Sequence, residues 1–174
     1  MILPTIRDKR FITLCRGGVL TDDDHRLLAL WAADCAEHVL HIFEDSCPND
    51  DRPRRAIEAT RAWVNGEIKM SASKELAGAA QNAARGIKGV SEAARMAALS
   101  AGQAAVVAHV AAHELGAAAY AIRTVMESAA KFEREATRIK ERDWQLSRLH
   151  KQIRELVIDD MRLRNDICWN VFIT

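Results

Sequence analysis

The chain has 174 residues, of which 49% are hydrophobic and 28% are charged, a balance typical of a globular protein rather than a disordered one. This length suits one compact domain, spanning 1–174, that buries a core without disulfides or structural metals. The 25 lysines and arginines nearly balance the 24 aspartates and glutamates, which leaves a formal net charge of +1. Such a balance predicts no general attraction to nucleic acid or to an anionic membrane.

The cysteines and the N-terminal residues predict the cellular compartment of the protein. Four cysteines are present and none belongs to a C-x-x-C pair, which disfavours a zinc ribbon or a thioredoxin-type motif. The opening string MILPTIRDKRF lacks the apolar stretch of a signal peptide, so we expect reduced thiols and a cytoplasmic protein. Residues 96–122 carry one formal charge, Glu114, but are mostly alanine and glycine, which favours a buried bundle helix over a membrane span.

The first half of the chain predicts an arm followed by two helices. Residues 1–20 are expected to form an extended arm with a short strand before a Gly-Gly turn. Thr21 is a good N-cap because three aspartates follow it, and apolar spacings of three and four then predict a helix to about Cys47. A second helix is expected from an Asp51 N-cap to the Asn-Gly stop at 65–66.

The middle of the chain predicts the core of the fold. A third helix is expected over 72–87, and Ser91 is placed to cap a fourth. This fourth pattern contains no proline and continues to about Glu127, with Gly116 as the point where it would kink or break. Its alanines and glycines allow close approach of neighbouring helices. The sequence therefore predicts an all-α, single-domain, multi-helix bundle around a central Ala-rich helix.

The last part of the chain is densely charged. From Lys131 onward, charges of both signs alternate with apolar helical positions, which is typical of solvated helix faces. Within this region Trp144 either docks the C-terminal helix or belongs to a partner surface. The tail, residues 166–174, is expected to be extended and to pair with the N-terminal arm.

Histidines on the predicted central helix are the first candidate site. His109 and His113 would share one face, and each would need a hydrogen-bond partner, because an unsatisfied buried polar group costs about 1–3 kcal/mol. The first helix offers Asp34 and His38. These four side chains would form either a divalent metal site between helices or a closed hydrogen-bond network. We favour the network and predict no cofactor, since the H-E-x-x-H motif is absent.

A second candidate site lies on the second predicted helix. Glu58 and Arg61 share a face with Arg54, where they would either grip an anion or form ion pairs along the helix. No serine, histidine and carboxylate arrangement indicates a hydrolase triad. We therefore expect a binding protein rather than an enzyme.

Four strings resemble one protein family: WAADCAEHVL, DDRPRRAIEATRAWVNGEI, AHVAAHELGAAAYA and ERDWQ. They look like the helical putative immunity proteins of bacteria and archaea, the immunity-five-like domain, over roughly 11–157. The resemblance implies a protein that binds and neutralises a cognate polymorphic toxin inside the producing cell. The alternative is a helical-bundle protein that binds a metal or a small ligand, and either protein can form a homo-oligomer. The matching strings contain the candidate residues Asp34, His38, Glu58, Arg61, His109 and His113.

Overall fold

The computed structural model describes residues 2–86, 89 and 91–173. The described residues form seven α-helices and no β-strand, so the all-α prediction is confirmed. The helices are α1 Asp22–Ser46, α2 Arg52–Val64, α3 Met70–Gly86, α4 Glu92–Val106, α5 Glu114–Ser128, α6 Arg134–Arg148 and α7 Arg154–Leu163. None of the described helices is both long enough and apolar enough to cross a membrane.

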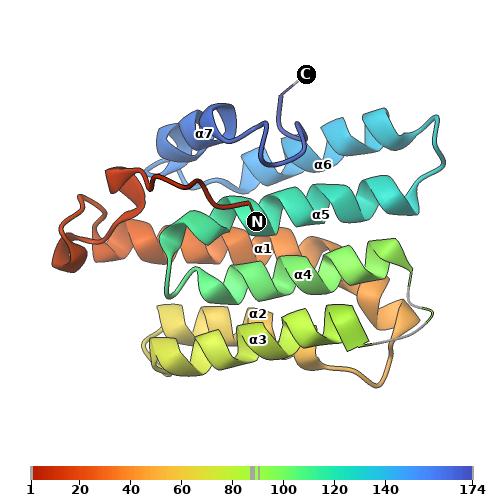
Figure 1. Cartoon of the computed structure of the whole chain (residues 1–174), viewed down its shortest axis with the longest axis horizontal. Helices are drawn as coiled ribbons and strands as arrows, with labels where there is room; N and C mark the ends of the chain where they lie inside the picture. Colours follow the sequence, from red (N-terminus) through yellow and green to blue (C-terminus); the bar gives the residue numbers. More distant parts are fainter. Residues whose placement is uncertain (1, 87–88, 90, 174) are drawn as a thin grey trace.

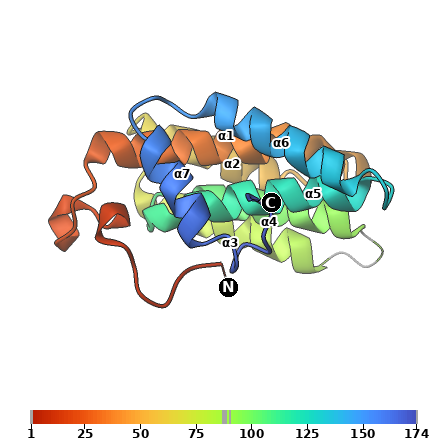
Figure 2. The same ribbon diagram turned by 90° about the horizontal axis from the view of Figure 1, so that it is seen from above.

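The helices form a bundle with α1, α4 and α5 at its centre (Figure 1). α2 and α3 cover one side of these three helices, and α6 and α7 cover the other, as the view from above also shows (Figure 2). The central helices supply most of the fully buried alanines, together with large side chains such as Trp31, Phe43 and Leu115. The core therefore lies where three helices with small side chains approach one another closely.

Predicted caps set the starts of two helices. Thr21 Oγ1 accepts a hydrogen bond from the Asp24 backbone N–H at 3.1 Å, and Ser91 Oγ does the same for the Ala94 N–H at 3.1 Å. Such caps satisfy backbone donors that have no partner inside the helix. The predictions for α1 and for the start of α4 are confirmed. Asp51 precedes α2 as predicted, although its side chain makes no capping hydrogen bond.

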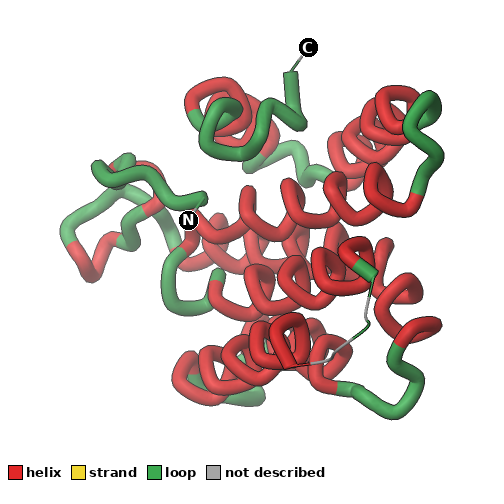
Figure 3. The backbone as a smooth tube through the Cα atoms, turned by 45° about the vertical axis from the view of Figure 1, so that its right-hand side comes forward, coloured by secondary structure: helices red, strands yellow, loops and turns green. Residues whose placement is uncertain are grey.

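The prediction of one continuous central helix is wrong. α4 ends at Val106, a short 3-10 turn occupies Ala111–His113, and α5 then runs back antiparallel to α4 (Figure 3). The chain breaks before Gly116 rather than at it. A straight helix of about 36 residues would extend about 54 Å, whereas a compact chain of this length, with a radius of gyration of about 16 Å, is only about 40 Å across. The valines around the break also lower helix propensity, because their branched side chains lose rotamer freedom.

Small and polar side chains hold this α4–α5 hairpin together. Ser100 Oγ donates to the Ala117 carbonyl at 2.7 Å across the two helices. Gly116 leaves room for Gln103, since a Cβ at position 116 would lie 2.5 Å from Gln103 Oε1. On the opposite face of α4, Ser73 of α3 donates to the Ala105 carbonyl at 2.9 Å. The hairpin is therefore a specifically packed unit rather than two helices in loose contact.

The arm and the tail differ from the extended segments that were predicted. The arm contains two 3-10 turns, Lys9–Phe11 and Leu14–Arg16, and one isolated bridge between Thr13 and Leu20. The described part of the tail is a series of turns, in which Asn165 Oδ1 accepts hydrogen bonds from two backbone N–H groups. No β-pairing joins the arm and the tail within the described residues.

A buried ionic cluster attaches α7 and the arm to the hairpin. Arg164 donates to Asp160 from Nε at 2.9 Å and to Glu114 from Nη2 at 3.2 Å, and all three side chains are buried. Its Nη1 donates to the carbonyls of Ala112 at 2.9 Å and Ile2 at 3.3 Å. Burial raises the pKa of Glu114, and the nearby Arg164 opposes this rise. We call Arg164, Glu114 and Asp160 the buried triad.

Candidate functional site

Charged side chains from three helices meet on one face of the bundle. Arg61 of α2 reaches α1, where it donates to Asp34 at 3.0 Å and to Glu37 at 2.5 Å. Arg148, in the last turn of α6, lies 3.5 Å from the other carboxylate oxygen of Asp34. Asp34 therefore sits between two arginines and links α1 to both α2 and α6.

A stacked pair of rings lies beside these charges. His38 of α1 and Trp144 of α6 stack with ring centroids 3.6 Å apart and planes 8° from parallel. His38 Nδ1 lies 2.9 Å from Oε2 of the buried Glu141. Because a carboxylate oxygen accepts hydrogen bonds, this contact takes the Nδ1–H of His38 as its donor, which fixes both the tautomer and the orientation of the ring. We call the surface group of Asp34, Glu37, His38, Arg61, Trp144 and Arg148 the α1–α6 patch.

A buried hydrogen-bond network supports the patch from below. Gln145 Nε2 donates to Glu141 Oε1 at 3.0 Å and to the Ala118 carbonyl at 3.2 Å. Trp31 Nε1 donates to the Gln145 carbonyl at 2.9 Å. Both oxygens of Glu141 are thus occupied, and the orientation of the ring pair is set from the core of the bundle.

The hollows around the patch suit side chains rather than an enclosed substrate. A shallow hollow of about 170 Å³ is lined by every patch residue except Arg61. A second, of about 230 Å³, lies against the ring pair and is also lined by Val125, Thr137 and Lys140. Sites for drug-sized ligands usually enclose about 300–1,000 Å³. This geometry therefore favours recognition of a protruding surface, such as that of a partner protein.

The structure places the remaining predicted residues elsewhere. His113 lies in the α4–α5 connection, with Nδ1 2.7 Å from Gln103 Oε1, and its burial lowers its pKa to about 4, helped by the charge of Arg164. His109 lines a recess at the end of the bundle, and its pKa is lowered by burial and then by nearby cations. Glu58 is exposed on α2 and makes no hydrogen bond or ion pair to another described residue.

The four residues of the predicted metal set do not come together. Asp34 and His38 belong to the α1–α6 patch, whereas His109 and His113 belong to the connection between α4 and α5. In the part of the chain that the structure describes, no group of three or more His, Cys, Asp or Glu side chains is placed to hold a metal ion. The histidines instead have separate surroundings, one exposed at the patch and the others at the hairpin turn.

Three residues of α6 complete the site without having been among the predicted site residues. Glu141 and Arg148 lie in the charged segment that was expected to be a solvated face, and Trp144 was expected either to dock the C-terminal helix or to belong to a partner surface. A signal was present, because Arg138, Glu141 and Gln145 recur at spacings of three and four and are all buried. A polar stripe with helical period can face the interior, but its composition alone looks the same as that of a solvated stripe.

The comparison with protein families adds to this geometry. The sequence model of the family described as Imm-5 like putative immunity protein matches residues 18–152. The chain belongs to this family. The match contains the whole α1–α6 patch, and it leaves out most of the arm and all of α7. No curated protein and no solved structure matches the chain significantly.

Proposed function

We propose that this immunity-family protein binds a cognate toxin in the cytoplasm of the producing cell and neutralises it without catalysis, using the α1–α6 patch as part of the contact surface. The family membership over residues 18–152 supports the general role. The observation that carries the choice of surface is the His38–Trp144 stack, held from beneath by the buried Glu141.

The residue types in the patch favour protein recognition. Tryptophan and arginine are the side chains most enriched at the energetic centres of protein interfaces, and the patch offers Trp144 with Arg61 and Arg148 beside it. A rigid, oriented ring pair loses little conformational freedom on binding, which improves affinity for a given contact area.

The ion pairs of the patch contribute little to the stability of the fold. The side chains of His38, Glu37 and Arg148 are 40%, 48% and 54% exposed. Ion pairs at such exposed positions typically contribute about 0–1 kcal/mol to stability. Their ordered arrangement is therefore better explained by recognition of a partner than by folding.

Binding to the toxin encoded beside the gene tests the proposal. We expect wild-type protein to form a complex by titration calorimetry, with a sedimentation profile that distinguishes this complex from a homo-oligomer. Trp144→Ala should weaken the complex by about 30-fold or more, the effect expected of a residue at the centre of an interface. Co-expression should show the same loss as reduced protection of the cell from the toxin.

Trp169→Ala is the matched control. Trp169 is also a surface tryptophan, 40% exposed, in a T-shaped contact with Tyr120 and with the Arg123 guanidinium above its ring, but it lies outside the family match. This variant should bind as the wild type does. If Trp144→Ala binds as tightly as the wild type, the patch is not the contact surface. If the wild type neither binds nor neutralises the toxin, the function itself is wrong.

A further inference from the structure

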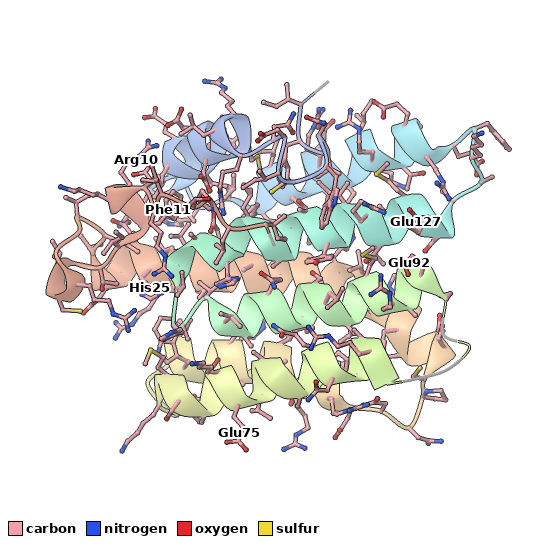
Figure 4. The ribbon with its side chains drawn as sticks, viewed as in Figure 1. Arg10, Phe11, His25, Glu75, Glu92 and Glu127 are labelled. Carbon is pink, nitrogen blue, oxygen red and sulfur yellow. The ribbon has the colours of Figure 1, made fainter. Side chains whose placement is uncertain are left out.

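Another hollow lies at the end of the bundle where the N-terminal arm folds over the helices. Figure 4 labels Phe11 of the arm and His25 of α1 at this end. The hollow has a volume of about 200 Å³. Its floor comes from α1, α2, the start of α3 and the α4–α5 connection, and its roof comes from the arm. We call it the arm recess, and the residues that matter for it are Arg7, Cys15, Arg16, His25, Trp63 and His109.

The roof of the recess is a fixed part of the fold. Phe11 and Leu20 of the arm are buried, and the Leu14 N–H donates to the Leu20 carbonyl at 3.1 Å. Arg10 anchors the arm to α7 through Asp159, 2.7 Å away. Gly18 lies so close to Ile12 that a Cβ at this position would be 1.9 Å from the Ile12 carbonyl oxygen. The arm therefore holds one close-fitting conformation over the recess.

The charges that line the recess are mainly positive. Arg7 and Arg16 both line it, whereas Asp22 is the one carboxylate among its described lining residues. Arg7 forms no hydrogen bond or ion pair with any other described residue. Arg16 donates to the His109 carbonyl at 3.2 Å and has no carboxylate partner in the described part of the chain. Two guanidinium groups thus keep most of their donors available beside one cavity.

The inner wall of the recess is aromatic and partly unsatisfied. His25 is buried, with its Nε2–H donating to the Val107 carbonyl at 2.7 Å, and its ring lies 4.9 Å from that of Trp63. His109 Nδ1 is shielded from solvent and has no hydrogen-bond partner among the described residues. The pKa of His109 is lowered by burial and then by Lys74, Arg16 and Arg7, which reflects the positive surroundings. The recess therefore combines an aromatic wall with positive surroundings, which suits a ligand that has both an apolar body and an anionic group.

We propose that the arm recess binds a small organic anion, with its phosphate or carboxylate group held by Arg7 and Arg16 and its body against Trp63. Arginine suits this role because its planar fork matches the oxygens of carboxylate and phosphate. The volume is below that of sites for drug-sized ligands, so the ligand is small. The site is separate from the α1–α6 patch and does not depend on toxin binding.

The exposed Cys15 provides a direct measurement, because it lines the recess and the other described cysteines are buried. We would follow its alkylation by iodoacetamide during titration with inorganic phosphate, and separately with succinate, at constant ionic strength. A ligand that occupies the recess should slow alkylation saturably, by up to about tenfold at ten times its Kd. Whichever of the two protects identifies the anion class. The ring resonances of His25 and His109 should shift with the same saturation curve.

Two variants decide whether the arginines hold the anion. Arg7→Gln with Arg16→Gln should weaken protection by at least about tenfold, since both charge-assisted contacts are lost. Arg85→Gln with Arg162→Gln, two exposed arginines outside the recess, should leave protection unchanged. Arg7→Gln alone removes no contact within the described chain, so it keeps the test valid if the double variant misfolds. The proposal is overturned if neither phosphate nor succinate protects Cys15 saturably. It is also overturned if the variants that lack Arg7 are protected as well as the wild type is.

Discussion

The α1–α6 patch and the buried triad are both clusters of arginines and carboxylates, but they are built in opposite ways. In the patch, Arg61 and Arg148 share Asp34 at the surface, where water competes for every donor. In the triad, Arg164 is buried away from solvent, and it donates hydrogen bonds to two carboxylates and two backbone carbonyls. The same chemistry therefore serves recognition at one place and attachment of chain segments at the other.

This difference predicts how each cluster responds to mutation. Removing one partner of a buried ion pair leaves the other charge without compensation, which typically costs about 3–5 kcal/mol. Removing one partner of an exposed pair returns both groups to water at little cost. Mutations in the triad should therefore lower the stability of the protein more than mutations in the patch do. Mutations in the patch should weaken toxin binding more than mutations in the triad do.

The largest expected effect is that of Arg164→Met. This change keeps much of the side-chain volume but leaves Glu114 and Asp160 buried with no cation, so we expect a loss of about 3–5 kcal/mol in the free energy of unfolding. Urea denaturation followed by circular dichroism measures it. Arg162→Met, on the exposed face of α7, is the control and should change stability by no more than about 0.5 kcal/mol. Equal losses in both variants would contradict the distinction.

The next effect is a dependence of stability on pH that comes from His113. Its pKa is about 4 in the fold, against an ordinary value of 6.5. Between pH 4 and pH 6.5, therefore, His113 is protonated in the unfolded chain but not in the folded one. Stability should be complete above pH 6.5 and fall as the pH drops towards 4, by about 3 kcal/mol from this group. The pKa of His25 is also lowered by burial, and it acts in the same direction.

Unfolding titrations of His113→Asn measure this contribution. The variant should lose the part of the slope between pH 6.5 and 4 that comes from His113 and keep the part that comes from His25 and His109, whose pKa values are also lowered in the fold. His41→Asn changes an exposed histidine of α1 and should retain the wild-type slope. A variant His113→Asn with an unchanged slope would place the pH dependence in other residues.

Glu141 lies where the patch meets the core, so it should show an intermediate effect. Glu141→Gln keeps the shape but removes the charge that accepts from His38, which should cost about 1–3 kcal/mol of stability. It should also loosen the His38–Trp144 stack, visible as a change in the near-ultraviolet circular dichroism of tryptophan. The control Glu37→Gln, at an exposed patch position, should alter neither signal.

The smallest expected effect on stability is that of Arg61→Ala. Its two carboxylate partners stay in contact with solvent, so the free energy of unfolding should fall by less than about 1 kcal/mol. A double-mutant cycle with Asp34→Ala measures the coupling between the two side chains directly. A coupling of several kcal/mol would show that the patch is structural after all, and would remove the contrast with the triad.

The sequence predicted local features of this protein better than it predicted distant partners. The caps at Thr21 and Ser91 follow from residues within one helical turn, and the structure confirms both. Asp34, His38 and Arg61 were identified from the spacing of polar residues on two helices. The partner of His38, Glu141, lies 103 residues later in the chain, and nothing in a single sequence states which helices will be neighbours.

The error at the central helix has a different physical origin. Alanine-rich sequence with few breakers fits one long helix and two short ones almost equally well, because the valines near the turn lower the local helix propensity only slightly. Tertiary contacts decide between the two. Ser100 donates a hydrogen bond to the Ala117 carbonyl across the hairpin, and Gly116 leaves room for the Gln103 side chain because it has no Cβ. Those contacts exist only once the chain has turned back.

The contacts of Arg164 also have a consequence for the order of folding. The side chain joins α7 to the Ile2 carbonyl, 162 residues away in sequence, and to the Ala112 carbonyl, 52 residues away. Contacts between residues so far apart close large loops. They form late in folding, because the conformational entropy of the loop must be lost before the contact stabilises the fold. We expect α1 to α5 to assemble while the chain is still being synthesised, with the Glu114 carboxylate still open to water. The arrival of α7 is then the event that buries this carboxyl group and completes the native protein.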